Sequence, residues 1–144
     1  MVETRVVATD TCNIAATAER IFALISDATS YPRWWPASLN VREVDGDVEV
    51  RPTGASFRCR MVENDPPRRI VVDYVGGPQR GQGVWTLEPA ADGQGTAVTY
   101  AVDLVPHGML AQMLFRTMDI RGIHSRLMQE VLAGLAREAE VGPS

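Results

Sequence analysis

The sequence predicts an α+β fold in which one long C-terminal helix lies across a curved antiparallel sheet of about seven strands. Strand-like segments follow one another between residues 39 and 105, and short turns rich in glycine, proline and aspartate separate them. The chain then continues over 109–140 without proline and with apolar residues at helical spacing. Because strands and helices are segregated along the chain, the helices are expected to cover one face of an antiparallel sheet.

The N-terminal part of the chain is expected to form one strand followed by two short helices. The strand covers 4–14, where valine, threonine and isoleucine recur. The first helix begins after Thr17, a residue type that caps helix N-termini, and it has a wide apolar face. The second is a helical turn between two prolines that contains Trp34 and Trp35. Neighbouring residues in a helix point in different directions, so only one of these tryptophans is expected in the core.

Six further strands are expected, each ending at a turn. Their ranges are 39–44, 48–51, 55–63, 69–75, 79–88 and 96–105. In the third of these strands Phe57, Cys59 and Met61 alternate with Arg58 and Arg60. Side chains point alternately to the two faces of a strand, so this pattern predicts one half-buried face and one face in water.

The C-terminal helix is expected over 109–140, with a break near Arg121 and Gly122, and is followed by a short tail over 142–144. Apolar residues recur on one side of this helix: Leu127, Met128, Val131, Leu132 and Leu135. A stripe of this kind is typical of a helix that packs against a sheet. A single helix laid across a curved sheet leaves room for an apolar pocket.

Composition and charge narrow the classes of function. The 144 residues are expected to form one domain, 1–144, with a full hydrophobic core. The net charge is −4, and no cluster of basic residues is present, so nucleic acid is not an expected partner. Cys12 and Cys59 lie in expected strands without nearby histidine or cysteine ligands. Both are expected to be free thiols, and neither a metal site nor a cofactor is expected.

The sequence carries no sign of export or of membrane insertion. The first five residues are polar and acidic, whereas a signal peptide begins with basic residues and continues with an apolar segment. No apolar run approaches the ~20 residues that a membrane-spanning helix requires. A cytoplasmic location and no membrane insertion are therefore expected.

Four stretches carry a resemblance to a known superfamily: NIAATAERIF at 13–22, YPRWWP at 31–36, DPPRRI at 65–70 and GVWTLEP at 83–89. In their order and spacing the chain resembles the START / Bet v 1-like (SRPBCC) superfamily, and within it the bacterial polyketide cyclase/dehydrase-like group, over 4–139. The resemblance implies the helix-grip fold and a cavity between the sheet and the last helix. Proteins similar to this one include ligand-binding and transport proteins, hormone receptors, aromatase/cyclases and ubiquinone-binding chaperones.

Strand alternation and this resemblance together predict a set of ligand-binding side chains. The expected set is Trp35, Phe57, Met61, Tyr74, Trp85, Tyr100, Met118, His124 and Leu127. Aromatic and methionine side chains make a suitable apolar wall for a flat molecule. For each of these residues the alternative is ordinary core packing. The glycine-rich stretch 76–83 is not a phosphate-binding loop, and Gly81 and Gly83 are expected to permit tight sheet curvature.

The candidates for catalysis are His124, Tyr100 and Arg121. His124 lies one helical turn before Leu127, so its ring is expected near the sheet, where a histidine can act as acid or base. The alternatives are a hydrogen-bonded structural role for His124 and a solvated side chain for Arg121. Aromatase/cyclases similar to this chain use an inward arginine, and no arginine here can be matched to it.

Two hypotheses about function follow. The favoured one is binding of a hydrophobic small molecule (polyketide-, lipid- or quinone-like) without turnover, by a monomer or weak dimer. The alternative is a polyketide aromatase/cyclase or dehydratase that acts on a poly-β-keto chain in the same cavity. A third class, a protein-interaction module that uses the outer face of the sheet, is disfavoured because that face carries Arg58, Arg60, Asp73 and Asp103.

Overall fold

The computed structural model describes residues 4–52 and 56–141. Its strands are β1 (Val6–Ile14), β2 (Arg42–Val44), β3 (Asp47–Val50), β4 (Phe57–Asp65), β5 (Arg69–Val75), β6 (Gln79–Pro89) and β7 (Thr96–Pro106). They form one antiparallel sheet in the order β1-β7-β6-β5-β4-β3-β2. From β2 to β7 each strand pairs with the next one along the chain, and β1 closes the series by pairing with β7. The predicted antiparallel sheet is confirmed.

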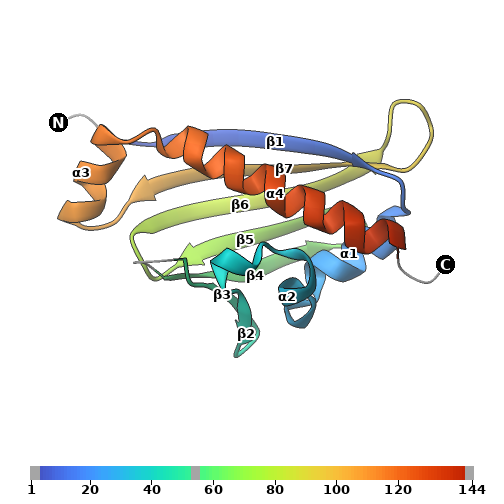
Figure 1. Ribbon diagram of the computed structural model, residues 1–144, viewed down its shortest axis with the longest axis horizontal. Helices are drawn as coiled ribbons and strands as arrows, with labels where there is room; N and C mark the ends of the chain where they lie inside the picture. The colour runs from blue at the N-terminus through green and yellow to red at the C-terminus, as the bar shows by residue number, and fades with distance from the viewer. Residues whose placement is uncertain (1–3, 53–55, 142–144) are drawn as a thin grey trace.

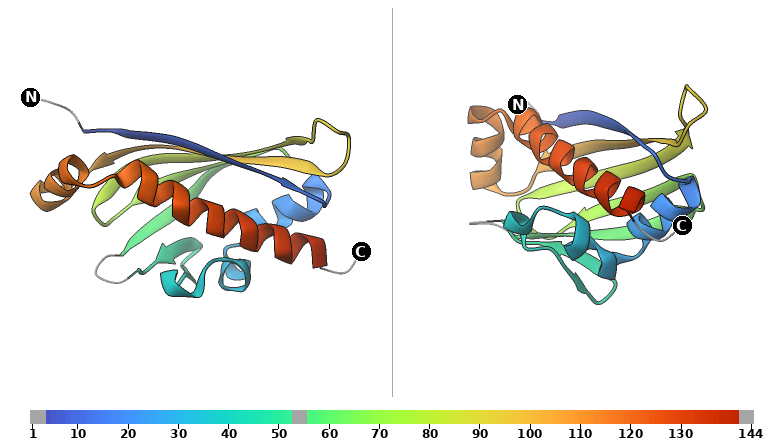
Figure 2. Two further views of the ribbon diagram at one scale, coloured as in Figure 1. Left: turned by 45° about the horizontal axis from the view of Figure 1, so that its top comes forward. Right: turned by 45° about the vertical axis from the view of Figure 1, so that its right-hand side comes forward.

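The helical elements are α1 (Ala18–Ser26), η1 (Ala28–Ser30), α2 (Tyr31–Trp34), η2 (Ala37–Leu39), α3 (Met109–Thr117) and α4 (Ile120–Val141). Figure 1 shows α4 crossing in front of the sheet, with α1 and α2 near its C-terminal end and α3 at the opposite end of the molecule. The two further views in Figure 2 show the same arrangement from other sides. The described helices include none with the length and apolar composition needed to span a membrane.

The first helix forms as its sequence predicts. The Thr17 hydroxyl accepts a hydrogen bond from the Arg20 backbone N–H at 3.2 Å, which satisfies one of the free donors at the helix start. Its apolar residues are buried: Ile21, Phe22, Leu24 and Ile25. α1 therefore closes one end of the sheet by hydrophobic burial.

The structure corrects two predicted boundaries. The strand expected over 39–44 is shorter, because Leu39 ends the 3₁₀ turn η2 and Asn40 has a left-handed backbone with φ 45°. The C-terminal helix breaks before the predicted position, since Met118 is extended and separates α3 from α4. The Asp119 carboxylate then accepts a hydrogen bond from the Gly122 N–H at 3.0 Å and caps the new helix. Of the other predicted boundaries, Ala55 and the tail 142–144 lie outside the described residues.

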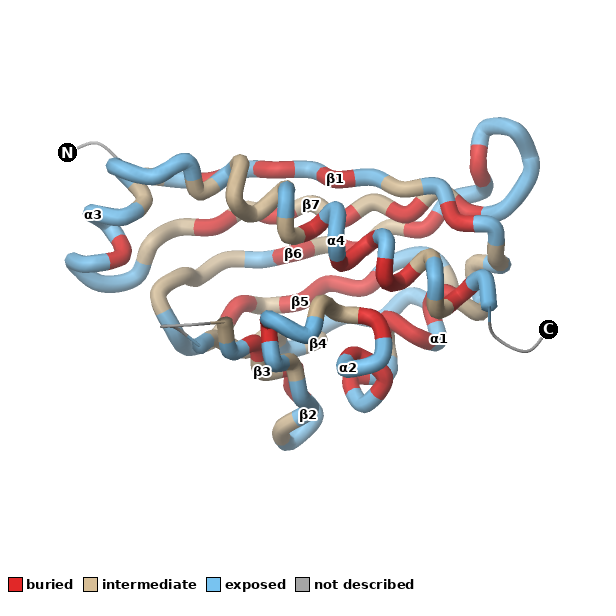
Figure 3. Tube along the Cα trace, in the orientation of Figure 1, coloured by how far each residue is buried: buried red, intermediate tan, exposed pale blue. Residues whose placement is uncertain are grey.

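α4 differs along its length. Its C-terminal part is buried against β1, α1 and α2, through Met128, Val131, Leu132, Gly134, Leu135 and Ala139. Its N-terminal part carries residues that are only partly buried, among them Ile123, His124 and Leu127. Figure 3 shows the buried positions gathered in the second half of this helix and exposed positions predominating on α3. The helix is thus anchored in the core at one end only.

Candidate functional site

Aromatic side chains from several strands face α4 and form one continuous cluster. Phe57 stacks on Tyr74 with ring centroids 5.6 Å apart. Trp85 lies 4.5 Å from Tyr100, its partner across β6 and β7. Trp34 from α2 reaches Trp85 edge-on at 6.3 Å. The inner face of the sheet therefore presents an aromatic wall, as strand alternation predicts.

Two tyrosines in this wall share a hydrogen bond across an intervening strand. The Tyr74 and Tyr100 hydroxyl oxygens are 2.6 Å apart, although β5 and β7 are separated by β6. The Tyr100 phenol crosses β6 over Gly83, where a Cβ would collide with the phenol. Burial raises the pKa of both phenols well above the usual value, so both are protonated at neutral pH. The lack of a side chain at Gly83 thus leaves the space in which the Tyr100 ring crosses β6.

A polar cluster lies between β1 and the N-terminal part of α4. Asp10 is only 7 % exposed and faces inward on β1, directly opposite Tyr100 in the strand register. Its carboxylate accepts hydrogen bonds from the Ser125 hydroxyl at 3.2 Å and from the Gln129 amide at 3.3 Å. Sequence reasoning missed Asp10. The signal was present, because Val6, Ala8 and Ile14 set the inward phase of β1 and Asp10 shares it.

His124 stands beside this carboxylate. Its ring stacks on Tyr100 with centroids 6.3 Å apart and an interplanar angle of 19°. Burial lowers the pKa of His124, and the nearby charge of Asp10 opposes part of that effect. The imidazole is therefore neutral at pH 7. Its Nδ1 atom is buried without a hydrogen-bond partner among the described residues, and the same holds for Nε1 of Trp35.

Several side chains that face the interior are only partly buried. They are Trp35, Val41, Phe57, Cys59, Met61 and Leu127, all packed against the core. A core residue enclosed on every side loses all contact with solvent, whereas these retain some. They come from β4, from the segment around α2 and β2 and from the N-terminal part of α4, and they lie at the margin of the core. Burial raises the pKa of the Cys59 thiol to about 12, with a smaller contribution from Asp47.

The structure places some of the predicted site residues in the aromatic cluster and others outside it. Trp34 is buried at 2 % exposure, and its indole N–H donates to the Ser30 hydroxyl at 3.0 Å, whereas Trp35 is half-buried and stacks on Tyr31. Of the two tryptophans, Trp35 is thus the one that the core encloses only in part. Met118 lies in the link between α3 and α4 and is 47 % exposed. Arg121 is exposed on the first turn of α4. The structure does not bring Met118 or Arg121 into the aromatic cluster.

No arginine supplies a positive charge to the interior. All 14 basic residues of the chain are arginines, and every one except Arg20, Arg58 and Arg80 is exposed. Arg20 donates to backbone carbonyls at the end of α4, and Arg80 donates to carbonyls at the start of β6. Arg58 points to the outer face, as predicted, and pairs there with two acids of β3.

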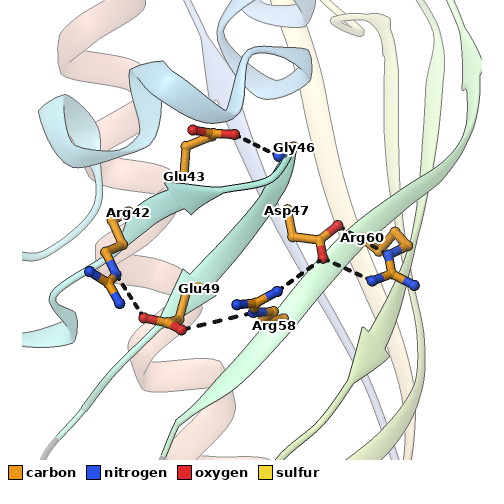
Figure 4. Close-up of polar contacts among 7 residues, drawn as sticks. All are labelled: Arg42, Glu43, Gly46, Asp47, Glu49, Arg58 and Arg60. Atoms are coloured by element: carbon orange, nitrogen blue, oxygen red, sulfur yellow. Dashed lines mark hydrogen bonds and ion pairs between the residues drawn. The ribbon is translucent and has the colours of Figure 1, made fainter.

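Figure 4 shows the outer-face network to which Arg58 belongs. Arg60 contacts both carboxylate oxygens of Asp47, at 3.1 and 3.0 Å. Glu49 accepts from Arg42 at 2.8 Å and lies 3.8 Å from Arg58. These pairs link β2, β3 and β4 across the surface that faces away from α4. The charged side chains of this network therefore pair with one another on the outer face of the sheet.

Two surface grooves lie apart from the aromatic cluster. One, with a volume of about 750 Å³, runs beside the start of α1 and is lined in part by Pro67, Leu87 and Gly95. The other, of about 620 Å³, follows exposed α3 residues, among them Met109 and Met113. Within the described ranges no three His, Cys, Asp or Glu side chains are grouped closely enough to hold a metal ion.

Comparison with known proteins places this geometry in context. Residues 5–140 match the family described as "Polyketide cyclase / dehydrase and lipid transport". A comparison with curated protein sequences gave no significant match.

Solved structures resemble the whole chain in fold. The Mll3558 protein from Rhizobium loti superposes with a TM-score of 0.72 at 17% identity, covering 96% of this chain and 99% of its own. The Aha1 dimer from Colwellia psychrerythraea gives a TM-score of 0.67 at 16% identity, covering 96% and 99%. The di-domain ARO/CYC BexL from the BE-7585A biosynthetic pathway gives 0.68 at 18% identity, covering 99% of this chain and 52% of its own. These neighbours have the helix-grip fold of a curved sheet and a long C-terminal helix.

Proposed function

Because the chain belongs to the polyketide cyclase/dehydrase and lipid transport family, we propose that it binds an apolar small molecule, without turnover, between the sheet and α4. The observation that carries the proposal is the set of inward apolar side chains that stay partly exposed, notably Trp35, Phe57 and Met61. Ligand sites are concave and mostly apolar, with few polar groups, and this interior has that composition.

The proposal is tested with Nile red, an uncharged dye whose emission rises in apolar surroundings. We expect one saturable site per chain. Met61→Trp, which places a larger side chain in the interior, should weaken binding by at least about tenfold, since it fills the space that the dye needs. The matched control is Val62→Trp, because Val62 is the next residue of β4 and is 45 % exposed. Equal affinity in both variants would place the site elsewhere.

A second candidate is polyketide cyclisation in the same interior, and the polar groups around Tyr100 favour it. Tyr74, Tyr100 and His124 lie together and could polarise a ketone or move a proton. Aldol closure joins an enol carbon to a ketone carbon, and loss of water then completes the ring without an oxidant. Mass spectrometry of a poly-β-keto thioester incubated with the protein tests this, and loss of one water that Tyr100→Phe abolishes would favour the enzyme. Without such turnover, binding alone remains.

A further inference from the structure

The short helix α3 carries an apolar face that the rest of the protein does not cover. Four of its large apolar side chains are exposed: Met109, Leu110, Met113 and Leu114. Residues three or four positions apart lie side by side on a helix, so these four form one continuous face. Ala111, on the other side of the helix, is buried. An exposed apolar patch of this kind marks a surface that contacts a partner or a membrane.

The shape of this surface favours a flat partner. The groove of about 620 Å³ beside the apolar face is lined by α3 residues alone: Met109, Leu110, Gln112, Met113, Arg116 and Thr117. One helix therefore supplies the whole lining, and no second element forms an opposite wall that could clamp a peptide. Figures 1 and 2 show α3 at the end of the molecule opposite α1, where a flat surface can reach it.

The small size of α3 argues against a protein partner. A stable protein interface takes about 20–30 residues from each side. α3 has 9 residues, and its two faces cannot both contribute because one side of the helix packs on the protein. A second copy of the chain held through α3 alone would thus have too small an interface.

The charge around the apolar face is positive, although the net charge of the chain is −4. Between Asp103 and Asp119 the chain has no acidic residue, and both of these carboxylates already have partners. Arg116 is exposed in the last turn of α3 and Arg121 in the first turn of α4, and neither forms an ion pair with another described residue. Two such arginines attract an anionic surface, whereas they would repel the same pair on a second copy.

We propose that α3 docks the protein on an anionic lipid surface, with its apolar face among the headgroups and with Arg116 and Arg121 against acidic phosphates. Amphipathic helices that combine an apolar face with arginine bind in the plane of the membrane interface. The 9 residues of α3 are far fewer than the ~20 that span a bilayer, so the helix lies along the surface. This surface is separate from the interior, so the proposal goes beyond the proposed function.

Co-sedimentation of the full chain with lipid vesicles tests the proposal. One set of vesicles is phosphatidylcholine alone, and the other is an equal mixture with phosphatidylglycerol, which is anionic. We expect binding to the anionic vesicles to be at least about tenfold tighter, since each arginine near a charged surface contributes about fivefold. Raising the salt from about 0.1 M to about 1 M should remove most of this preference, because the Debye length falls from ~10 Å to ~3 Å.

A double variant tests the apolar face. Met109→Ser/Met113→Ser removes two exposed apolar side chains and should weaken binding to the anionic vesicles by at least about tenfold. The matched control is Val7→Ser/Val62→Ser, because both valines are exposed and lie on strands away from α3. The control should bind as the unaltered protein does.

A single charge change tests the arginines. Arg116→Gln should weaken binding to the anionic vesicles by about fivefold. Arg137→Gln makes the same change in the C-terminal half of α4, where Arg137 is exposed, and should alter the affinity by less than about twofold.

The outcomes decide between occupants of the α3 surface. Equal binding to both kinds of vesicle, no binding to either, or undiminished binding by the methionine variant would overturn the proposal. So would a dimer, seen by sedimentation velocity without lipid, that the methionine variant dissociates. The vesicle comparison uses the unaltered protein, and so does not depend on how the variants fold. Nile red binding in the interior is measured without vesicles, so either proposal can fail while the other stands.

Discussion

Gly134 offers the sharpest test of how α4 is held. A Cβ at this position would collide with the backbone carbonyl oxygen of Trp34 in α2. That carbonyl cannot rotate away as a flexible side chain could, because Trp34 is buried at 2 % exposure and its indole is bonded to Ser30. In Gly134→Ala the helix must therefore move away from α2.

Two effects of opposite sign decide the outcome. Alanine in place of glycine inside a helix stabilises it by about 0.8–1.0 kcal/mol. Forcing extra volume into a packed contact costs about 1–3 kcal/mol, and more where the backbone must shift. Because the contact here is with backbone, we expect the upper part of that range and a net loss of about 1–2 kcal/mol. For a domain of this size, the melting temperature should fall by about 4 °C per kcal/mol.

Urea unfolding, followed by tryptophan emission and by circular dichroism, measures the change. Ala133→Gly is the matched control, because Ala133 is exposed on the same turn and reports helix propensity alone. It should cost about 1 kcal/mol. If Gly134→Ala were instead more stable than the unaltered protein by a similar amount, only propensity would be acting, and α4 would not be in tight contact with α2.

Three further predictions follow from the interior. Gly83→Ala should cost about 1–3 kcal/mol by displacing the Tyr100 phenol, and a double-mutant cycle with Tyr100→Leu should show that the two losses are not additive. The free energy of unfolding should fall as the pH drops below about 6.5, because His124 is then protonated in the unfolded chain, whereas burial lowers its pKa in the folded protein. Urea unfolding at several pH values should show a smaller fall in His124→Gln. In a Cys12→Ser background, native Cys59 should react with DTNB at pH 8 at least about a hundredfold more slowly than the unfolded chain, because its pKa of about 12 leaves little thiolate; equal rates would refute the burial of that thiol.

Local periodicity accounts for what the sequence predicts well. In β7 Val98, Tyr100 and Val102 are buried while Thr99 and Ala101 are less so, as strict alternation requires. Trp85 and Leu87 follow the same pattern in β6. The period of a strand is a property of neighbouring residues, so the inner face of each strand can be assigned without the fold. The segregation of strands and helices then leads to the layer arrangement.

Features that depend on distant residues are less predictable. Asp10 can be placed inward from the phase of β1, but its partners Ser125 and Gln129 lie 115 and 119 positions away. Their contact depends on how α4 is rotated about its axis, which no local pattern specifies. The helix break is different, because Asp119 is a common N-cap residue and a local signal existed. The sequence analysis places the break at Gly122 and not at Asp119, because glycine has the lower helix propensity of the two.

The two halves of α4 differ in burial, and under the proposed function they have different roles. The C-terminal half is anchored by apolar side chains such as Val131 and Leu135, which are buried beside α1 and α2. The N-terminal half supplies the polar and half-buried groups that face the aromatic wall, such as His124 and Leu127. The residues of the first set are fully buried, so truncating one of the large side chains there costs about 2–5 kcal/mol. Residues of the second set are not fully enclosed, and replacing them costs less. Under the proposed function, we therefore expect substitutions in the N-terminal half to change ligand affinity while the C-terminal half keeps the helix packed on the sheet.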